Sequence, residues 1–404
     1  MKVPIYKEEG MKKTLLSLGI ALCLIASPLI SQDPIEGKWK AKVKKDRIQM
    51  RMTIADDEDL SKGWNYCTYY KKDDFIGLQW EREHTFKLIR EAGTISFQGQ
   101  FSVNSGSGHF IFQPDKKFEK FLSNKGFEGI STKKMLILCL NDVNSQYIDE
   151  LFKLGYSGIS LSKLISFAIH DVSIDYIKEI HALGYKDIAL SKLISFRIHD
   201  VEPDYIQSLQ DLGYSGITPS KLISFAIHDV SLQYIKDLNS LGFKEIEPSK
   251  LISFCIHDVE IDLIKSLRDL GYSDISPSKI VSFAIHGVSS SFIQKIHSLG
   301  YKDISPSRLI SFRIHDVDPE FIKGVHDLGY SDISPSKLIS FAIHGVSLDF
   351  IKDIHLVGYK DISSSQLISF RIHGVDKKYI KYIQDKWEEK LSPSKIISLK
   401  IHGF

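Results

Sequence analysis

Residues 159–187 read ISLSKLISFAIHDVSIDYIKEIHALGYKD, and close copies of this 29-residue segment follow one another from about residue 115 to the last residue. One histidine per copy marks the register, because nine histidines stand 29 residues apart: His170, His199, His228, His257, His286, His315, His344, His373 and His402. A fixed period of this length is typical of a solenoid, in which each repeat buries its apolar face only against its neighbours. The repeat therefore favours a helical array over an enzyme domain.

Each copy predicts two short helices. Ser160 and Ser173 have the residue type of N-caps, and each precedes an apolar stripe with helical spacing. The first helix is expected to end at His170, where Asp or Gly follows, and the second at Gly184, since these types accept the left-handed conformation that terminates helices. About ten such hairpins fill residues 115–404, and because helices of about ten residues are marginal alone, they must be stabilised by stacking.

Residues 34–113 lack the repeat and carry β-rich runs such as Lys38–Val43 and Thr94–Phe101, separated by turn residues. They predict a small antiparallel β domain, so the fold class is α+β multidomain: a β domain followed by an all-α solenoid. Trp39, Trp64 and Trp80 all lie in this domain. They are expected to fill its core, with a ligand platform as the alternative.

The first 31 residues predict a signal peptide. Met11-Lys12-Lys13 is a basic start that is followed by an apolar stretch from Thr14 to Ala26, too short for a membrane span, and Met11 is a possible true start. We therefore expect an exported protein, periplasmic or secreted, with no transmembrane helix after cleavage; lipid anchoring at Cys23 is less expected. The formal charge of +2 argues against a nucleic-acid partner.

No catalytic, cofactor-binding or metal site is predicted. The nine histidines would lie roughly 10 Å apart in adjacent repeats, whereas two ligands of one zinc ion need nitrogens within about 3.5 Å. Each histidine is instead expected to be structural, at a helix C-terminus whose last carbonyls and dipole it stabilises. The acidic run Asp56-Asp57-Glu58-Asp59 lacks the ligand spacing of a calcium loop and is expected to be a solvated turn.

A second period of 58 residues overlies the first, because Phe-Ala-Ile alternates with Phe-Arg-Ile. It spaces Arg197, Arg313 and Arg371 along one line of the array. These arginines, with the three tryptophans, are the candidate binding residues.

The wording of the repeat, for example in Val346–Lys352 and Leu367–Val375, resembles a repeat found in exported bacterial proteins. In some of these the repeat is attached to membrane-bound M56/BlaR1-like peptidase-sensor proteins, and Glu91–Gly99 resembles the β-rich segment that precedes it there. The resemblance covers most of the mature chain and implies a repeat module of uncharacterised function. The HExxH helix of the peptidase is absent from this sequence, so the resemblance implies no proteolysis.

The pattern favours a non-catalytic exported scaffold that binds a protein or other macromolecule at the bacterial envelope. Two alternatives stay open. In one, the β domain binds a small ligand or glycan and the solenoid is a spacer; in the other, the chain is an envelope sensor or regulatory module.

Overall fold

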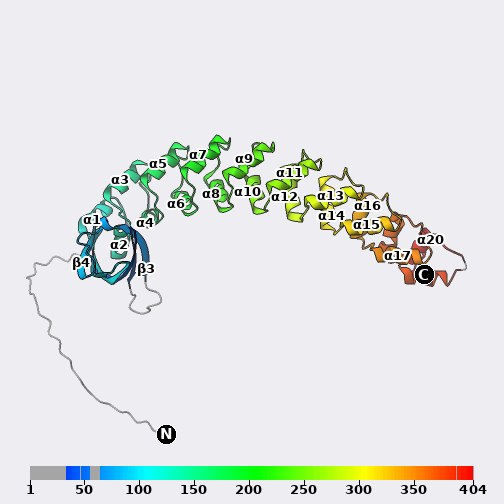
Figure 1. Cartoon of the computed structure of the whole chain (residues 1–404), viewed down its shortest axis with the longest axis horizontal. Coiled ribbons are helices and arrows are strands. Elements are labelled where there is room, and N and C mark those ends of the chain that lie inside the picture. The colour runs from blue at the N-terminus through cyan, green and yellow to red at the C-terminus, as the bar shows by residue number, and fades with distance from the viewer. Residues whose placement is uncertain (1–32, 46, 55–63, 388, 404) are drawn as a thin grey trace, which may run out of the picture. The chain divides into compact units, whose positions relative to one another are not determined.

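The computed structural model describes residues 33–45, 47–54, 64–387 and 389–403 (Figure 1). The predicted signal peptide at residues 1–31 and the acidic run Asp56–Asp59 lie outside the described residues. The chain forms two compact units, Met1–Asp149 and Glu150–Phe404.

The first unit contains an antiparallel six-stranded sheet, which confirms the predicted β domain. Its strands lie in the order β3-β2-β1-β6-β5-β4. They are β1 (Ile35–Lys44), β2 (Arg47–Ile54), β3 (Trp64–Lys71), β4 (Glu83–Arg90), β5 (Gly93–Phe101) and β6 (Ser105–Pro114), with a 3-10 turn at Lys72–Asp74 after β3.

Alternation along each strand gives the sheet an apolar inner face and a polar outer face. Phe86, Phe97 and Trp39 are buried on the inner face, and the Phe86 and Phe97 rings stack with centroids 4.9 Å apart. Helix α2 (Thr132–Leu140) packs against β5 and β6 on this face, and the Tyr70 hydroxyl from β3 donates to the Leu140 carbonyl at 3.2 Å. The sheet therefore curls around one helix.

Because of this packing, the boundary between the two units lies later in the chain than the end of the sheet. The sheet ends at Pro114, one residue before the predicted start of the solenoid, but α1 (Lys116–Asn124) and α2 belong to the same compact unit as the sheet. The first repeat thus forms part of the core of the β domain, and the boundary falls within α3 (Ser145–Lys153).

The remaining helices confirm the repeat array: ten consecutive helix pairs run from α1 to α20. After α3 they are α4 (Leu161–Ile169), α5 (Ile174–Ala182), α6 (Leu190–Ile198), α7 (Pro203–Asp211), α8 (Pro219–Ile227), α9 (Leu232–Ser240), α10 (Pro248–Ile256), α11 (Ile261–Asp269), α12 (Pro277–His286), α13 (Ser290–Ser298), α14 (Pro306–Ile314), α15 (Pro319–Asp327), α16 (Pro335–Ile343), α17 (Leu348–Leu356), α18 (Ser364–Ile372), α19 (Lys377–Gln384) and α20 (Pro393–Ile401). Within the described ranges, no helix is both long and apolar enough to span a bilayer.

Local hydrogen bonds set the helix ends as the sequence predicts. The Ser160 hydroxyl accepts from the Lys163 N–H, which makes Ser160 the N-cap of α4. At the other end Asp171 takes a φ of 53°, and the Val172 N–H returns to the Phe167 carbonyl at 2.9 Å. This closure turns the chain at once into the next helix.

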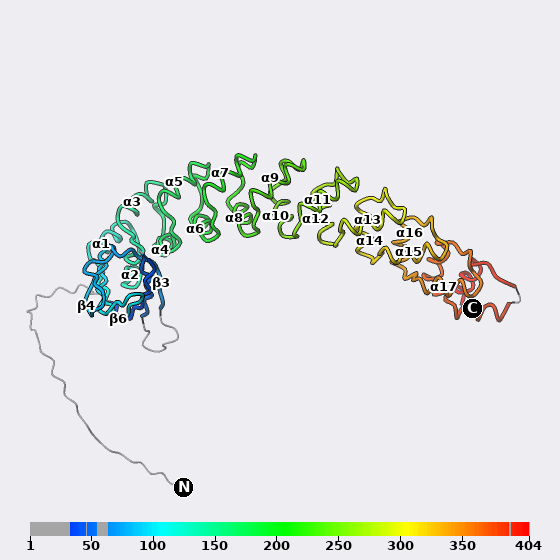
Figure 2. The backbone as a smooth tube through the Cα atoms, viewed as in Figure 1, coloured from blue at the N-terminus to red at the C-terminus, as the bar shows by residue number. Residues whose placement is uncertain are grey.

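Within the second unit the helices form two rows (Figures 1 and 2). Even-numbered helices contact the next even-numbered helix, and odd-numbered helices contact the next odd-numbered one. Each even helix from α4 to α18 has one phenylalanine that is fully buried between the rows: Phe167, Phe196, Phe225, Phe254, Phe283, Phe312, Phe341 and Phe370. Leu399 takes this place in α20. Nine-residue helices thereby gain the apolar burial that they lack alone.

Two positions on α8 test this account of stability. Replacing the buried Phe225 with Ala should cost about 3–5 kcal/mol, because it empties a packed site. Replacing Ile227, which is 50% exposed, with Ala should change the free energy of unfolding by only about 0.5 kcal/mol. Urea unfolding followed by far-ultraviolet circular dichroism measures both, and equal losses would contradict stacking through the phenylalanine row.

Candidate functional site

The three tryptophans do not share an exposed surface. Trp39 is 1% exposed and donates its indole N–H to the His109 carbonyl at 3.1 Å, so it belongs to the core. Trp80 contacts the ring of Phe101, a core residue that Trp39 also contacts, at a centroid distance of 5.2 Å. Trp64 lies apart from both and stacks on Tyr66 at 5.5 Å.

The arginine line consists of contacts between repeats. Each guanidinium lies over an aromatic ring of the preceding repeat: Arg197 over Tyr176 at 5.0 Å, Arg313 over Phe292 at 5.2 Å and Arg371 over Phe350 at 5.0 Å. Each Nε also donates to a carbonyl at the C-terminus of the preceding even helix, those of His170, His286 and His344. The arginines therefore cap one helix from the next, with one of the five N–H groups of each guanidinium.

The nine periodic histidines lie at the C-terminal ends of the even helices. Eight of them are the C-cap residue, and His286 is the last helical residue of α12, which Gly287 ends with a φ of 65°. Among the described residues, no three His, Cys, Asp or Glu side chains come together in a way that could hold a metal ion.

A second set of histidines joins the odd helices, and the sequence alone did not reveal its partners. His181, His297, His326 and His355 lie near the ends of α5, α13, α15 and α17, and each Nε2 is 3.0–3.2 Å from a tyrosine hydroxyl of the preceding repeat. The partners are Tyr156, Tyr272, Tyr301 and Tyr330, 25 residues earlier in each case.

Each of these tyrosine hydroxyls also donates to a backbone carbonyl 32 residues later in the chain. The Tyr301 hydroxyl lies 2.7 Å from the Ile333 carbonyl, to which it donates. Since a hydroxyl has one proton, the Nε2–H of His326 must donate to the same oxygen. This ladder sets the register of three consecutive repeats.

Burial lowers the pKa of His181, His297 and His355 below the ordinary value of 6.5, and a neighbouring lysine lowers it further in each case. An acidic residue nearby, such as Asp187 beside His181, partly offsets the shift. The inter-repeat contact thus prefers the neutral ring.

From α4 to α20 the even helices also share recurring surface residues, although the position of Ala168 is Arg, Cys or Lys in other copies. Their last helical isoleucine is 49–56% exposed in every copy: Ile169, Ile198, Ile227, Ile256, Ile285, Ile314, Ile343, Ile372 and Ile401. We call these nine residues the isoleucine row. Two serines per helix, such as Ser162 and Ser166, recur in all nine copies on the same helices, and a Lys or Arg follows the first of them in eight.

The odd helices repeat no exposed apolar position of this kind. Their exposed position at Lys178 is Lys or Gln in all eight copies from α5 to α19, and the next position, at Glu179, varies from copy to copy. The isoleucines of the even helices are about half exposed, so packing accounts for only part of their recurrence. The even-helix surface is therefore the candidate functional site.

A scan against protein-family models and a search of curated proteins found no match to this chain.

The histidine–tyrosine ladder predicts a pH dependence of stability. Because the folded-state pKa of the three histidines is lowered, the unfolded chain binds more protons, so their stabilisation is complete above about pH 6.5 and is lost as the pH falls through the folded value. The melting temperature should therefore drop between about pH 7.5 and pH 5, by roughly 2–4 °C for each kcal/mol lost.

The control uses a residue that the chain itself carries at this position. Gln210 and Gln384 replace the histidine in two repeats, and each donates to a carbonyl of the preceding repeat at 2.9 and 2.8 Å. A triple variant His181→Gln, His297→Gln and His355→Gln should keep the melting temperature near pH 7.5 and reduce its fall at lower pH. An unchanged pH profile would contradict the prediction.

Proposed function

We propose that the chain is a non-catalytic scaffold whose even helices bind an extended segment of a protein partner. The observation that carries the proposal is the isoleucine row, an exposed apolar position that recurs in nine even helices and has no counterpart on the odd helices. Contiguous exposed apolar residues with a polar surround are typical of interaction sites. A single exposed isoleucine would need no explanation, whereas nine at one position do.

The chemistry of one repeat defines what the partner must offer. Ser166 donates its hydroxyl proton to the Ser162 carbonyl at 3.0 Å, and the same bond recurs in the copies from Ser195 to Ser340, which leaves the hydroxyl oxygen as an acceptor. Each repeat therefore presents an apolar contact from Ile169, an acceptor and, in most copies, a cation such as Lys163. A protein segment with apolar side chains, N–H donors and carboxylates complements this set.

The spacing of the repeats favours an extended partner. Packed helices lie about 8–10 Å apart, and three residues of an extended chain span roughly 10 Å. In a polyproline II conformation, with three residues per turn and about 3.1 Å per residue, every third side chain would meet the same site on the next repeat. Covering one half-exposed isoleucine contributes on the order of 1 kcal/mol, so many weak contacts would add to a specific complex.

Export to the bacterial envelope is part of the proposal. It is supported by the basic start Met11-Lys12-Lys13 with its apolar continuation, and by the resemblance of the repeat to exported bacterial proteins. A non-catalytic role is supported by the recurrence of nearly every residue type in the array, whereas catalysis depends on one particular constellation.

Site-specific cross-linking in the producing cell tests the proposed face. A photo-reactive amino acid replaces Ile227 or Ile256 on the even helices, and Lys236 or Lys265 on the odd helices as matched controls. We expect discrete protein adducts from the even positions alone. The adducts at 227 should be lost when Ile198 and Ile256 are both changed to Asp, because charges replace the apolar contacts on either side.

Adducts from the odd positions alone, or equal adducts from both rows, would contradict the proposal. Adducts that contain only a second copy of the chain would mean that the face mediates self-association and binds no other protein. Adducts with carbohydrate would support the even helices as the binding face but would contradict a protein partner.

A further inference from the structure

The outer face of the sheet carries a strongly basic centre. Lys38, Lys40, Lys42 and Lys44 alternate along β1 and all point away from the apolar core, as their exposure shows. Since β1 is a central strand of the sheet, these cations have neighbours on both sides.

The strand register places like charges directly opposite each other. Lys40 pairs with Arg51 of β2, and Lys44 pairs with Arg47. Like charges that lie directly opposite each other destabilise a sheet. Among the described residues, Lys40, Lys42 and Arg51 form no ion pair that would relieve this repulsion. The fold gains nothing from this arrangement, and a bound anion would compensate its cost.

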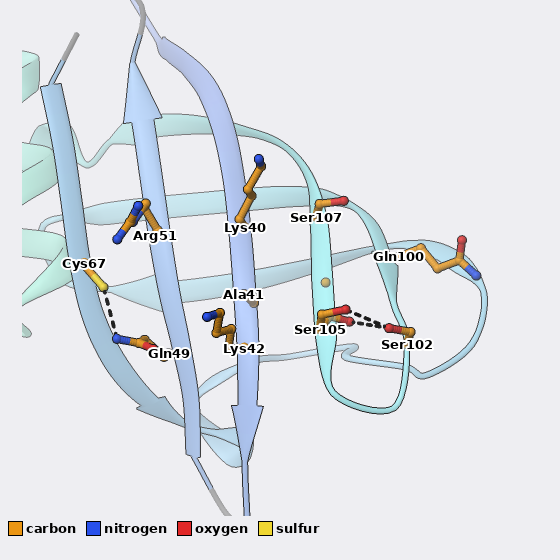
Figure 3. A pocket seen from close by; sticks show the side chains of 11 residues that line it. Lys40, Ala41, Lys42, Gln49, Arg51, Cys67, Gln100, Ser102, Ser105 and Ser107 are labelled. Carbon is orange, nitrogen blue, oxygen red and sulfur yellow. Dashed lines mark hydrogen bonds between the residues drawn. The ribbon is translucent and has the colours of Figure 1, made fainter. Parts of the chain in front are cut away.

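A hollow of about 670 Å³ lies at the pair of Lys40 and Arg51 (Figure 3). Lys40, Lys42 and Arg51 line one side of it, and Ser105 and Ser107 of β6 lie opposite. The register explains the hollow: Lys40 faces Ser107 and Lys42 faces Ser105, so long side chains border short ones. The pair Lys44 and Arg47 does not line it.

The lining indicates the chemistry of the occupant. Lysine and arginine bind phosphate and carboxylate groups through charge-assisted hydrogen bonds. The hydroxyls of Ser102, Ser105 and Ser107 and the side-chain amides of Gln49 and Gln100 can donate to and accept from hydroxyl groups. The hollow has the volume of a small-molecule site, far more than a bare phosphate needs.

We propose that this hollow binds an anionic sugar, with Lys40, Lys42 and Arg51 on its phosphate or carboxylate group and the serine and glutamine side chains on its hydroxyls. The site goes beyond the scaffold function and does not depend on it. It also differs from a tryptophan platform, since none of Trp39, Trp64 and Trp80 lines it.

Calorimetric titration of the full chain tests the site with four probes: glucose 6-phosphate, glucuronic acid, neutral glucose and inorganic phosphate. One or both charged sugars should bind at least about tenfold more tightly than glucose and than phosphate, since only they engage both sides of the hollow. The two charged sugars distinguish a phosphate from a carboxylate ligand.

Two double variants separate the site from general charge. Lys40→Gln with Arg51→Gln should weaken binding of the charged sugar by about tenfold or more, whereas Lys44→Gln with Arg47→Gln removes the same charge from the same two strands outside the hollow and should change it less than about threefold. The melting temperature of the first variant should not fall, because a repulsive pair has been removed.

Three outcomes would overturn the proposal. They are equal losses in both double variants, which would mean non-specific attraction; binding of phosphate as tight as that of either charged sugar; and the absence of measurable binding of both charged sugars to the unmodified chain.

Discussion

Every feature of the second unit depends on stacking between neighbouring repeats. Its helices are eight to ten residues long, shorter than an isolated helix needs for stability in water. Their apolar side chains are nevertheless buried, because the phenylalanine of each even helix from α4 to α18 and the isoleucines of the odd helices, such as Ile177 and Ile180, lie between the rows. Secondary structure in this unit is thus a consequence of tertiary contacts, and a repeat cannot be understood apart from its neighbours.

Apolar stacking alone sets no unique register, and polar contacts between repeats supply one. The Tyr176 hydroxyl donates to the Val201 carbonyl at 2.7 Å, and the same bond recurs at Tyr205 and Tyr234. At Phe292 and Phe350 phenylalanine replaces this tyrosine, and there Arg313 and Arg371 lie over the ring and bond to a helix end. Arg197 lies over Tyr176 in the same way, so both kinds of contact can join one pair of repeats. A directional bond penalises a slipped arrangement, because slipping leaves a buried polar group without its partner.

The parts of the structure that could be predicted from the sequence are those set by local chemistry. Ser160 and Asp171 mark the ends of α4 through contacts within a few residues, and a 29-residue period needs no knowledge of the fold to be seen. The partners of His181 and Arg197 lie 25 to 27 residues away and depend on how one repeat sits on the next, which the pattern does not contain. A similar limit applies to the tryptophans, which were expected to fill the core: Trp39 is buried there, whereas Trp80, between β3 and β4, is 37% exposed. Whether an aromatic side chain lies in the core depends on where the fold places it, which its residue type does not reveal.

The two candidate surfaces share one physical property: each retains an arrangement that stability does not require. On the outer face of the sheet, Lys40 stands opposite Arg51, although an uncharged or acidic residue would pair better there. On the even helices, half-exposed isoleucine occupies nine positions where a polar residue would cost the fold little. In each case the neighbouring surface offers an internal comparison, since Lys42 faces the neutral Gln49 and the odd helices repeat no exposed apolar position. Features that the fold does not need, and that persist beside equivalent positions without them, are best explained by an interaction outside the chain.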